Sequence, residues 1–272
     1  MKTKNMDISK HDDEIKMNLV SWRNKPLLRE IYIAFHKLIA KHLSRGLDAY
    51  TVELGSGIGN IKEVIPNCIR TDLLPKPWID RVENAYHLSF SDNAVDNLIL
   101  FDVFHHLRYP GTSLKEFHRV LAPNGRVIIF DPCMSILGLI VFGLFHHEGL
   151  GLGKGIRMFA PKGWSSNKDL YYAAQGNASR IFIGRKYQSF LEDWRVVTKQ
   201  RISAISYVAS GGYSKPQLYP DIAFPLMKVV DRMCDMVPLI FATRLLVILE
   251  KKEFAERIRI DCESKANHDL IL

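Results

Sequence analysis

A short apolar segment that runs directly into three closely spaced glycines constrains the fold of this chain more than any other feature. Residues 50–54 (Tyr-Thr-Val-Glu-Leu) read as a strand, residues 55–59 (Gly-Ser-Gly-Ile-Gly) as a tight turn, and residues 61–65 as the start of a helix. This order is typical of the βα unit that opens a doubly wound sheet. The sequence therefore predicts an α/β protein with a ligand-binding loop around residue 57.

Strand and helix signals continue to alternate over residues 50–132, as a parallel sheet requires. The predicted strands are 67–71, 95–101 and 126–130, with a turn at 123–125; the predicted helices are 26–43 and 114–121. Only 13 positions separate Gly59 from Asp72, so the helix between them is expected to be short. Beyond residue 132 we expect an apolar segment at 134–145, strands at 194–207 and 243–249, and a helical insertion at 222–237.

Charge and cysteine content limit the partners and the compartment. The 37 Lys and Arg against 29 Asp and Glu give a net charge of +8, which favours anionic partners: nucleic acid, phosphorylated metabolites or an acidic membrane surface. The basic residues stand in ones and twos, so a nucleic-acid groove is not expected. The four scattered cysteines fit a reducing compartment. The longest apolar stretch, 132–145, is shorter than the ~18 residues of a membrane span, so we expect a cytoplasmic protein.

The glycine spacing bears on the ligand. A nicotinamide or flavin turn needs G-x-G-x-x-G, and Asn60 stands where its third glycine would be. A turn of glycines, which have no side chains, suits a ligand without phosphates as well as it suits a dinucleotide. The Glu53 carboxylate just before the turn suits a cationic ammonium group on that ligand. A nicotinamide-dependent oxidoreductase nevertheless remains the alternative from another class.

Five motifs in order resemble the class I S-adenosylmethionine (SAM)-dependent methyltransferases over residues 50–132. The resemblance is strongest to the small-molecule group that includes the ubiquinone and menaquinone biosynthesis methyltransferases. The motifs are the glycine turn after Glu53, the acidic Asp72 at the end of the second strand, the segment 84–92, the strand 95–101 followed by Asp102 and His105-His106, and the segment 116–125. The resemblance implies a doubly wound, mostly parallel seven-stranded sheet with helical insertions near the C-terminus, and SAM as the cofactor.

The same resemblance implies which residues hold the cofactor. The glycines would let the backbone approach the methionine part of SAM, and Asp72 would accept hydrogen bonds from both ribose hydroxyls. Asn84 stands where the family usually has an aspartate that contacts the adenine amino group, and its amide oxygen can accept the same bond. The expected cofactor-binding residues are Glu53, Gly55, Ser56, Gly57, Gly59, Asp72, Leu73, Asn84, Ala85, Tyr86, Phe101 and Asp102.

Methyl transfer needs an aligned acceptor and, for a hydroxyl, a base. Two histidine pairs are candidates: His105-His106 after the strand 95–101, and His146-His147, followed by Glu148. Which of the four acts as the base stays open. His146, His147 and Glu148 are adjacent in the sequence, and three adjacent residues surround a metal ion poorly unless a fourth ligand comes from elsewhere in the fold. The sequence therefore predicts no metal site.

The acceptor would be bound by the part of the chain after residue 132. The expected organisation is an N-terminal helical segment (1–46), a SAM-binding core (47–132), an acceptor-capping region with the last strands of the sheet (133–250), and a C-terminal tail (251–272). The apolar segments 134–145 and 222–237 form either a packed lid or a patch that rests on a membrane. We therefore expect a methyltransferase for a small-molecule acceptor, with an amphiphilic or lipid-linked molecule as a reasonable hypothesis and oxygen as the favoured target. The other alternative is a catalytically silent SAM-fold adaptor.

Overall fold

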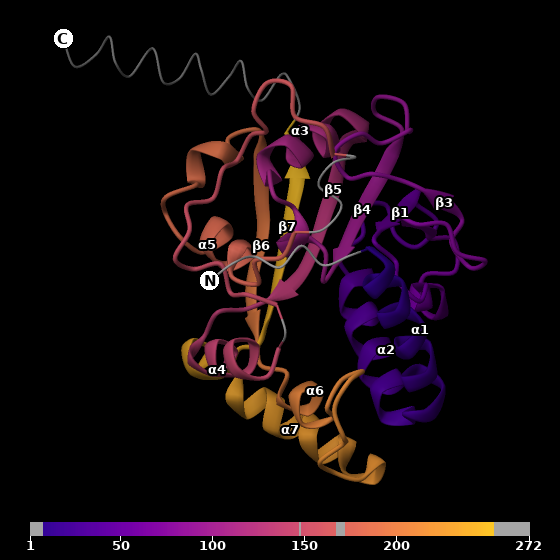
Figure 1. Ribbon diagram of the computed structural model, residues 1–272, viewed down its shortest axis with the longest axis vertical. Helices are drawn as coiled ribbons and strands as arrows, with labels where there is room; N and C mark the ends of the chain where they lie inside the picture. Colours follow the sequence, from indigo (N-terminus) through magenta and orange to yellow (C-terminus); the bar gives the residue numbers. More distant parts are fainter. Residues whose placement is uncertain (1–7, 147, 167–171, 253–272) are drawn as a thin grey trace, which may run out of the picture.

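A single seven-stranded sheet forms the centre of the molecule in the computed structural model, which describes residues 8–146, 148–166 and 172–252 (Figure 1). The strand order is β3-β2-β1-β4-β5-β7-β6, and β7 is antiparallel to both of its neighbours. The predicted doubly wound, mostly parallel sheet is therefore confirmed. The strands are β1 (Thr51–Leu54), β2 (Ile69–Asp72), β3 (Arg81–Val82), β4 (Val95–Phe101), β5 (Leu121–Pro132), β6 (Trp194–Ile202) and β7 (Arg244–Lys251).

Helices cover both faces of the sheet because its central strands are apolar on both sides. In β4, Leu98 and Leu100 face one core cluster, which includes Phe117 and Phe182, whereas Ile99 faces the other. The helices are α1 (Ile8–Asn24), α2 (Pro26–Ala40), α3 (Pro110–Val120), α4 (Ile136–Leu144), α5 (Asn177–Phe182), α6 (Ile205–Ala209), α7 (Phe224–Cys234) and α8 (Pro238–Phe241). Short 3₁₀ turns lie at Asn60–Glu63, Phe104–His106, Gln188–Leu191 and Asp221–Ala223.

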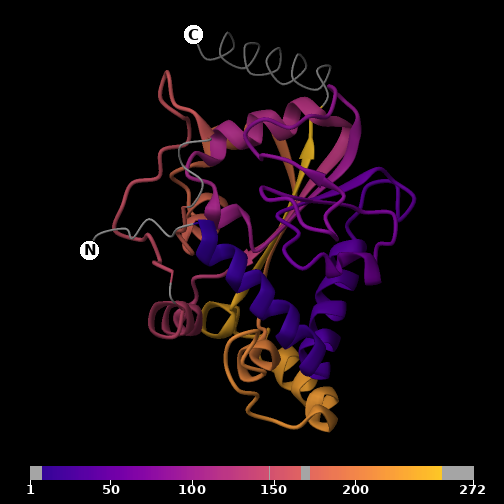
Figure 2. The same cartoon turned by 45° about the vertical axis from the view of Figure 1, so that its right-hand side comes forward.

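The segments α4, α6 and α7 gather beyond the carboxyl ends of β5 and β6, at the lower end of the molecule in Figure 1. The turned view in Figure 2 shows the same grouping. In open α/β sheets, ligands bind at the carboxyl ends of the strands. These helices are therefore placed to cover a binding site. Within the part of the chain that the structure describes, no helix is long and apolar enough to cross a membrane.

Several strands and helices have other boundaries in the structure than the sequence predicts. The strand predicted at 194–207 ends at Ile202, because the backbone N–H and the hydroxyl of Ser206 donate to Asp231 of α7 and so start α6. The predicted turn at 123–125 lies inside β5, where Asn124 takes a positive φ of 60° beside a shift in register. The short helix expected after the glycine turn is a single 3₁₀ turn, Asn60–Glu63.

Gly138 gives a test of how α4 is packed. A Cβ at this position would lie 1.9 Å from the carbonyl oxygen of Cys133, which is backbone and cannot move aside cheaply. We expect Gly138→Ala to lower the free energy of unfolding by at least about 2 kcal/mol, as overpacking of a buried site does. The matched control is Gly143→Ala in the same helix, where the added Cβ meets only the flexible tip of Leu150 at 3.3 Å. Chemical denaturation of both variants measures the difference, and equal stability would contradict this packing.

Candidate functional site

Two cavities meet at the carboxyl edge of the sheet. The first has a volume of about 180 Å³ and lies over the ends of β1, β2 and β4. The second, of about 660 Å³, extends from β1 and β4 toward α1, α4 and the loop after α6. Both are lined by Gly55, Gly57, Asp102 and His106. A ligand in the first cavity can therefore face a second ligand across these four residues.

The glycine turn needs its glycines for different reasons. Gly55, Gly57 and Gly59 have φ values of 67°, 52° and 71°, a region that L side chains rarely adopt. A Cβ at Gly55 would lie 2.6 Å from Cγ2 of Val103, whereas a Cβ at Gly57 would meet no atom within 4 Å. Gly59 is not among the residues that line the two cavities; its N–H closes the turn on the carbonyl of Ser56 at 2.7 Å. Gly57 is therefore the glycine most open to a ligand.

Glu53, at the end of β1, is a buried carboxylate without a full set of partners. Its side chain lines the second cavity, and its Oε2 atom has no hydrogen-bond partner among the described residues. Burial raises the pKa of Glu53 to about 7; a hydrogen bond from Ser56 opposes this rise and Asp72 adds to it. A buried, unpaired oxygen beside a bare glycine turn fits a cationic group of a bound ligand.

Asp72, at the end of β2, already supports the turn. Its Oδ2 accepts the N–H of Gly57 at 3.0 Å, and its Oδ1 accepts the N–H of Leu74 at 3.4 Å. The carboxylate lines the first cavity, and each oxygen has a further lone pair for a ligand hydroxyl. Ser56 has a supporting role, because its hydroxyl donates to the carbonyl of Glu53 and accepts the N–H of Thr71.

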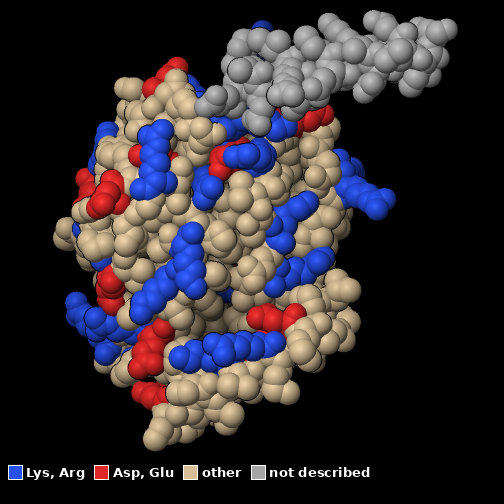
Figure 3. Space-filling view, turned by 180° about the vertical axis from the view of Figure 1, so that it is seen from behind, with Lys and Arg blue, Asp and Glu red and all other residues tan. Residues whose placement is uncertain are grey.

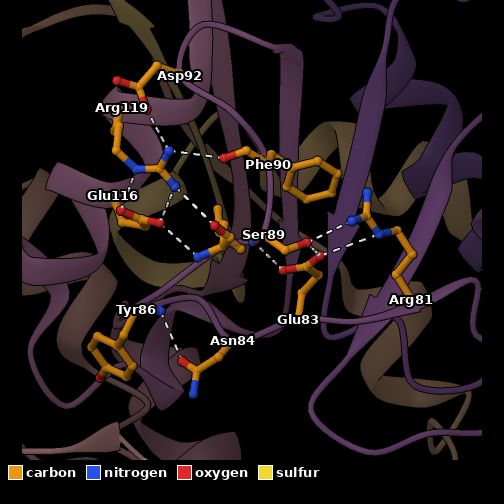
Figure 4. A network of polar contacts seen from close by, with 10 residues as sticks. Arg81, Glu83, Asn84, Tyr86, Ser89, Phe90, Asp92, Glu116 and Arg119 are labelled. Atoms are coloured by element: carbon orange, nitrogen blue, oxygen red, sulfur yellow. Dashed lines mark hydrogen bonds and ion pairs between the residues drawn. The ribbon is translucent and has the colours of Figure 1, made fainter.

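A polar network fixes the segment that follows β3 against α3 (Figure 4). Arg119 donates to the carbonyl oxygens of Leu88 and Phe90 at 3.0 Å each, and Glu116 accepts the N–H of Leu88 at 2.7 Å. Glu83 accepts hydrogen bonds from the backbone and the hydroxyl of Ser89. The wall of the first cavity that this segment forms is therefore held by charge-assisted bonds.

The predicted adenine-side residues Asn84, Ala85 and Tyr86 line the first cavity, as does the half-exposed Leu73. Asn84 is already engaged: its Oδ1 accepts the N–H of Tyr86 at 3.0 Å, and its Nδ2 donates to Ser166 at 3.0 Å. The second lone pair of Oδ1 can still accept a bond from a ligand. Its assignment to the adenine group stays a prediction.

One histidine pair and Glu148 form a cluster between the cavities. His105 is buried, and its Nδ1 lies 3.1 Å from Oδ1 of Asp131. Nδ1 of His106 donates to the carbonyl of Tyr172 at 2.8 Å. Burial alone would lower the pKa of His105, but Asp131 and Glu148 raise it to about 10, whereas burial and the neighbouring His105 lower the pKa of His106 to about 4. The two adjacent histidines therefore have opposite charge preferences.

The cluster of His105, His106 and Glu148 does not include His146, the first residue of the second predicted histidine pair. His146 lines the second cavity, and its Nδ1 accepts the N–H of Glu148 at 3.3 Å. His147 lies outside the described residues. The remaining predicted residues, Phe101 and Asp102, line the second cavity, where Phe101 stacks on Tyr32 with ring centroids 5.2 Å apart.

Sequence reasoning missed three buried residues of this region. Arg244, which is 2% exposed, pairs with Asp102, and its guanidinium lies 4.5 Å from the ring centroid of Tyr207. Asp131 and Gln175 contact His105. Asp131 did carry a signal, because it ends a predicted strand at the ligand-binding edge of the sheet.

Comparison with known proteins agrees with this arrangement. Residues 52–129 match the family described as "Methyltransferase domain". The chain contains a class I SAM-dependent methyltransferase domain. The match covers β1, β2, β4, α3 and most of β5, which are the elements that carry the glycine turn, Asp72 and the histidine pair.

More distant similarities to other proteins were also found. A 50-residue segment is 36% identical to the probable polyketide synthase 10 of Dictyostelium discoideum, which is 18% of this chain and 2% of that protein. The cyclase SpnF covers 81% of this chain and 80% of its own, with 11% identity and a TM-score of 0.47. The geranyl diphosphate C-methyltransferase of Streptomyces coelicolor, solved with S-adenosyl-L-homocysteine, covers 80% of this chain and 75% of its own, with 12% identity and a TM-score of 0.45.

Proposed function

We propose that this protein transfers a methyl group from SAM to the oxygen of a small, amphiphilic acceptor. The observation that carries the proposal is the meeting of the two cavities at Gly55, Gly57, Asp102 and His106. The first cavity would hold the adenosine part of SAM, and the second would hold its methionine part near Glu53 and then the acceptor. The methyl group would face the acceptor at the junction.

Different residues of the chain would bind different parts of SAM. Glu53 would bind the ammonium group of SAM, Asp72 the ribose hydroxyls, and the segment 84–86 the adenine. The fit rests on the unpartnered Oε2 of Glu53, which a cation satisfies, and on the open space above Gly57. When bound, SAM supplies a sulfonium methyl whose bond to sulfur breaks as the bond to the acceptor oxygen forms. The cluster of His105, His106 and Glu148 at the junction would draw away the proton of the acceptor hydroxyl.

Titration calorimetry and product labelling test this function together. We expect SAM and its demethylated product to bind and NAD to show no binding. Incubation with methyl-labelled SAM and fractionated cell extract should place label in the lipid phase. Binding of NAD in place of SAM would indicate an oxidoreductase. Tight SAM binding without any labelled product would indicate an adaptor and would overturn the catalytic proposal.

An amphiphilic acceptor is supported by the rim of the second cavity. Three of its lining residues, Met17, Phe145 and Leu218, are 68%, 67% and 76% exposed. These side chains come from α1, the end of α4 and the loop after α6, so they surround the mouth from different sides. An apolar rim favours an acceptor that leaves a lipid phase rather than water.

The helices next to this rim would rest on a membrane surface. Of α4, α7 and α8, only Gly138, Phe142 and Phe224 are buried, so most of their apolar side chains point outward and do not form a packed lid. The exposed apolar surface continues over the lower end of the molecule, which is mainly tan in Figure 3. It includes Ile136, Leu139, Ile140, Leu144, Ile222, Leu226, Val229, Met233, Met236, Val237, Leu239 and Ile240. We call this set the apolar end.

The charges beside the apolar end are suited to anionic lipid. Lys215, Lys228 and Arg232 are exposed there against one exposed carboxylate, Asp221. The carboxylates of Asp231 and Asp235 turn inward, where they accept hydrogen bonds from Ser206 and Ser203. A basic rim around an apolar face is typical of helices that lie in the membrane interface.

Vesicle sedimentation checks this contact. We expect the protein to bind phosphatidylglycerol vesicles more strongly than phosphatidylcholine vesicles, and added salt to weaken the binding. The combined replacement Leu226→Ser, Met233→Ser and Met236→Ser should weaken binding at least tenfold, because burial of each side chain contributes about 1.5–3 kcal/mol. The matched control replaces exposed apolar residues elsewhere, Leu47→Ser, Val82→Ser and Val197→Ser. Equal loss in both sets, or no binding by the original protein, would contradict the membrane contact.

A further inference from the structure

Three side chains from two distant parts of the chain converge at the junction of the cavities. His105 and His106 follow β4, and Glu148 lies after α4. Nε2 of His105 is 3.4 Å from Oε2 of Glu148, and Nε2 of His106 is 3.8 Å from its Oε1. The three ligand atoms of this group all lie within 4.8 Å of one another. The fold thus brings His105 and His106 from another part of the chain to Glu148. The adjacent residues 146–148 do not by themselves supply enough well-placed ligands for a metal ion.

Each histidine is oriented through its other ring nitrogen. Nδ1 of His105 faces the buried carboxylate of Asp131 at 3.1 Å, and Nδ1 of His106 donates to the carbonyl of Tyr172 at 2.8 Å. Both contacts direct Nε2 toward Glu148. A carboxylate or a backbone carbonyl on the far nitrogen is the arrangement that orients metal-binding histidines.

The spacing of the group suits a small divalent ion. Four ligands at about 2.1 Å around a tetrahedral ion lie about 3.4 Å apart, close to the two observed separations. Nitrogen and carboxylate ligands together suit zinc and similar transition metals. The second cavity is lined by all three side chains, which leaves a fourth position that faces the cavity.

A buried polar atom next to the group is also unexplained. Gln175 is 2% exposed, its Nε2 contacts Glu148 and lies 3.3 Å from Nε2 of His105, and its Oε1 has no hydrogen-bond partner among the described residues. Rotation of the amide by half a turn exchanges the nitrogen for this oxygen, which can then face a cation. In this orientation the amide oxygen could make a further contact with an ion held by His105 and Glu148.

We propose that His105, His106 and Glu148 bind a divalent transition-metal ion whose open position takes the acceptor oxygen. This inference deepens the proposed function, on which it rests. With the ion bound, the cluster would promote loss of the acceptor proton through the metal and not as a direct base: the ion would lower the pKa of the acceptor hydroxyl, and the released proton would pass to water in the open cavity. The three side chains then act as ligands, and Asp131 and the carbonyl of Tyr172 are positioning groups.

Metal titration of the full chain tests the site without a catalytic assay. We expect one Co²⁺ per chain, with the visible absorption bands of a tetrahedral site, and displacement of Co²⁺ by Zn²⁺ in calorimetry. Glu148→Gln and His106→Gln should each weaken Zn²⁺ binding at least 100-fold. Asp131→Asn, which changes only the orienting partner of His105, should weaken it 10- to 100-fold.

A matched control separates this site from adventitious binding. His42→Gln removes a histidine beyond the end of α2 that lines neither cavity, and it should leave Zn²⁺ affinity unchanged. SAM affinity and thermal unfolding, measured on the same samples, show whether each variant is folded. Zn²⁺ binding that Glu148→Gln leaves unchanged, or no stoichiometric binding, overturns the metal site while intact SAM binding leaves the proposed function standing. Loss of SAM binding by the original protein would instead overturn the proposed function.

Discussion

Glu53→Gln is expected to stabilise the free protein and to weaken SAM binding at the same time. Burial raises the pKa of this carboxyl from 4.5 to about 7, so the ionised side chain is unfavourable in the folded state. The shift corresponds to about 3 kcal/mol at pH 8, which the neutral amide would recover. The amide cannot pair with an ammonium group, so SAM affinity should fall at least tenfold.

The pH dependence of this effect has a definite sign. A carboxyl whose pKa is raised on folding contributes stability below its unfolded pKa and loses it as pH rises through the folded pKa. The original protein should therefore lose stability between about pH 4.5 and pH 7 through Glu53, and Glu53→Gln should lack this part of the profile. The charged groups that act on Glu53 are Asp72 and Arg70, which remain in the variant.

Denaturation at several pH values and calorimetry with SAM measure both effects. The control is Glu30→Gln, which replaces an exposed glutamate on α2 and should change neither quantity. A variant that is less stable at pH 8, or that binds SAM as tightly as the original protein, would show that Glu53 is a structural group only.

Asp72→Ala is expected to weaken SAM binding by at least tenfold, or about 1.4 kcal/mol, because it removes the acceptor for the ribose hydroxyls. It also removes the bond that holds the N–H of Gly57 at 3.0 Å, so the turn should become more mobile. Asp72→Asn keeps one acceptor oxygen and should lose less affinity than the alanine variant.

Isothermal titration of both variants with SAM measures these losses. Asp48→Ala, an exposed aspartate before β1, serves as the control and should bind SAM normally. An unchanged dissociation constant in Asp72→Ala would mean that the ribose lies elsewhere.

Local sequence signals predicted six of the seven strands, and β3 was not among them. β4 was predicted over residues 95–101, its observed range, because a continuous apolar run bounded by polar residues is a strong strand signal. The helix α1 lies inside the helical segment expected over residues 1–46, but its bounds were not predicted because its sequence is mostly polar; Ile15 is among the few apolar residues that it buries. The end of β6 depends on Asp231, which lies 29 positions after Ile202, and no local pattern reveals such a contact.

The site was predicted in part for the same reason. Each expected cofactor residue lies on a motif that can be read along the chain. The convergence of His105 with Glu148 joins positions 43 residues apart, and the missing partner of Glu53 is a property of its surroundings. Both depend on the folded chain, so a motif could indicate the residue types but not their contacts.

The position of β7 has a consequence for how this chain is synthesised. It is the last strand along the described sequence, yet it lies between β5 and β6 and hydrogen-bonds to both. Until residue 251 has left the ribosome, the edges of β5 and β6 that β7 later occupies therefore stay unpaired, and such edges promote aggregation. Premature stop codons before β7 should therefore yield insoluble fragments, even though every motif expected to bind the cofactor has already been translated.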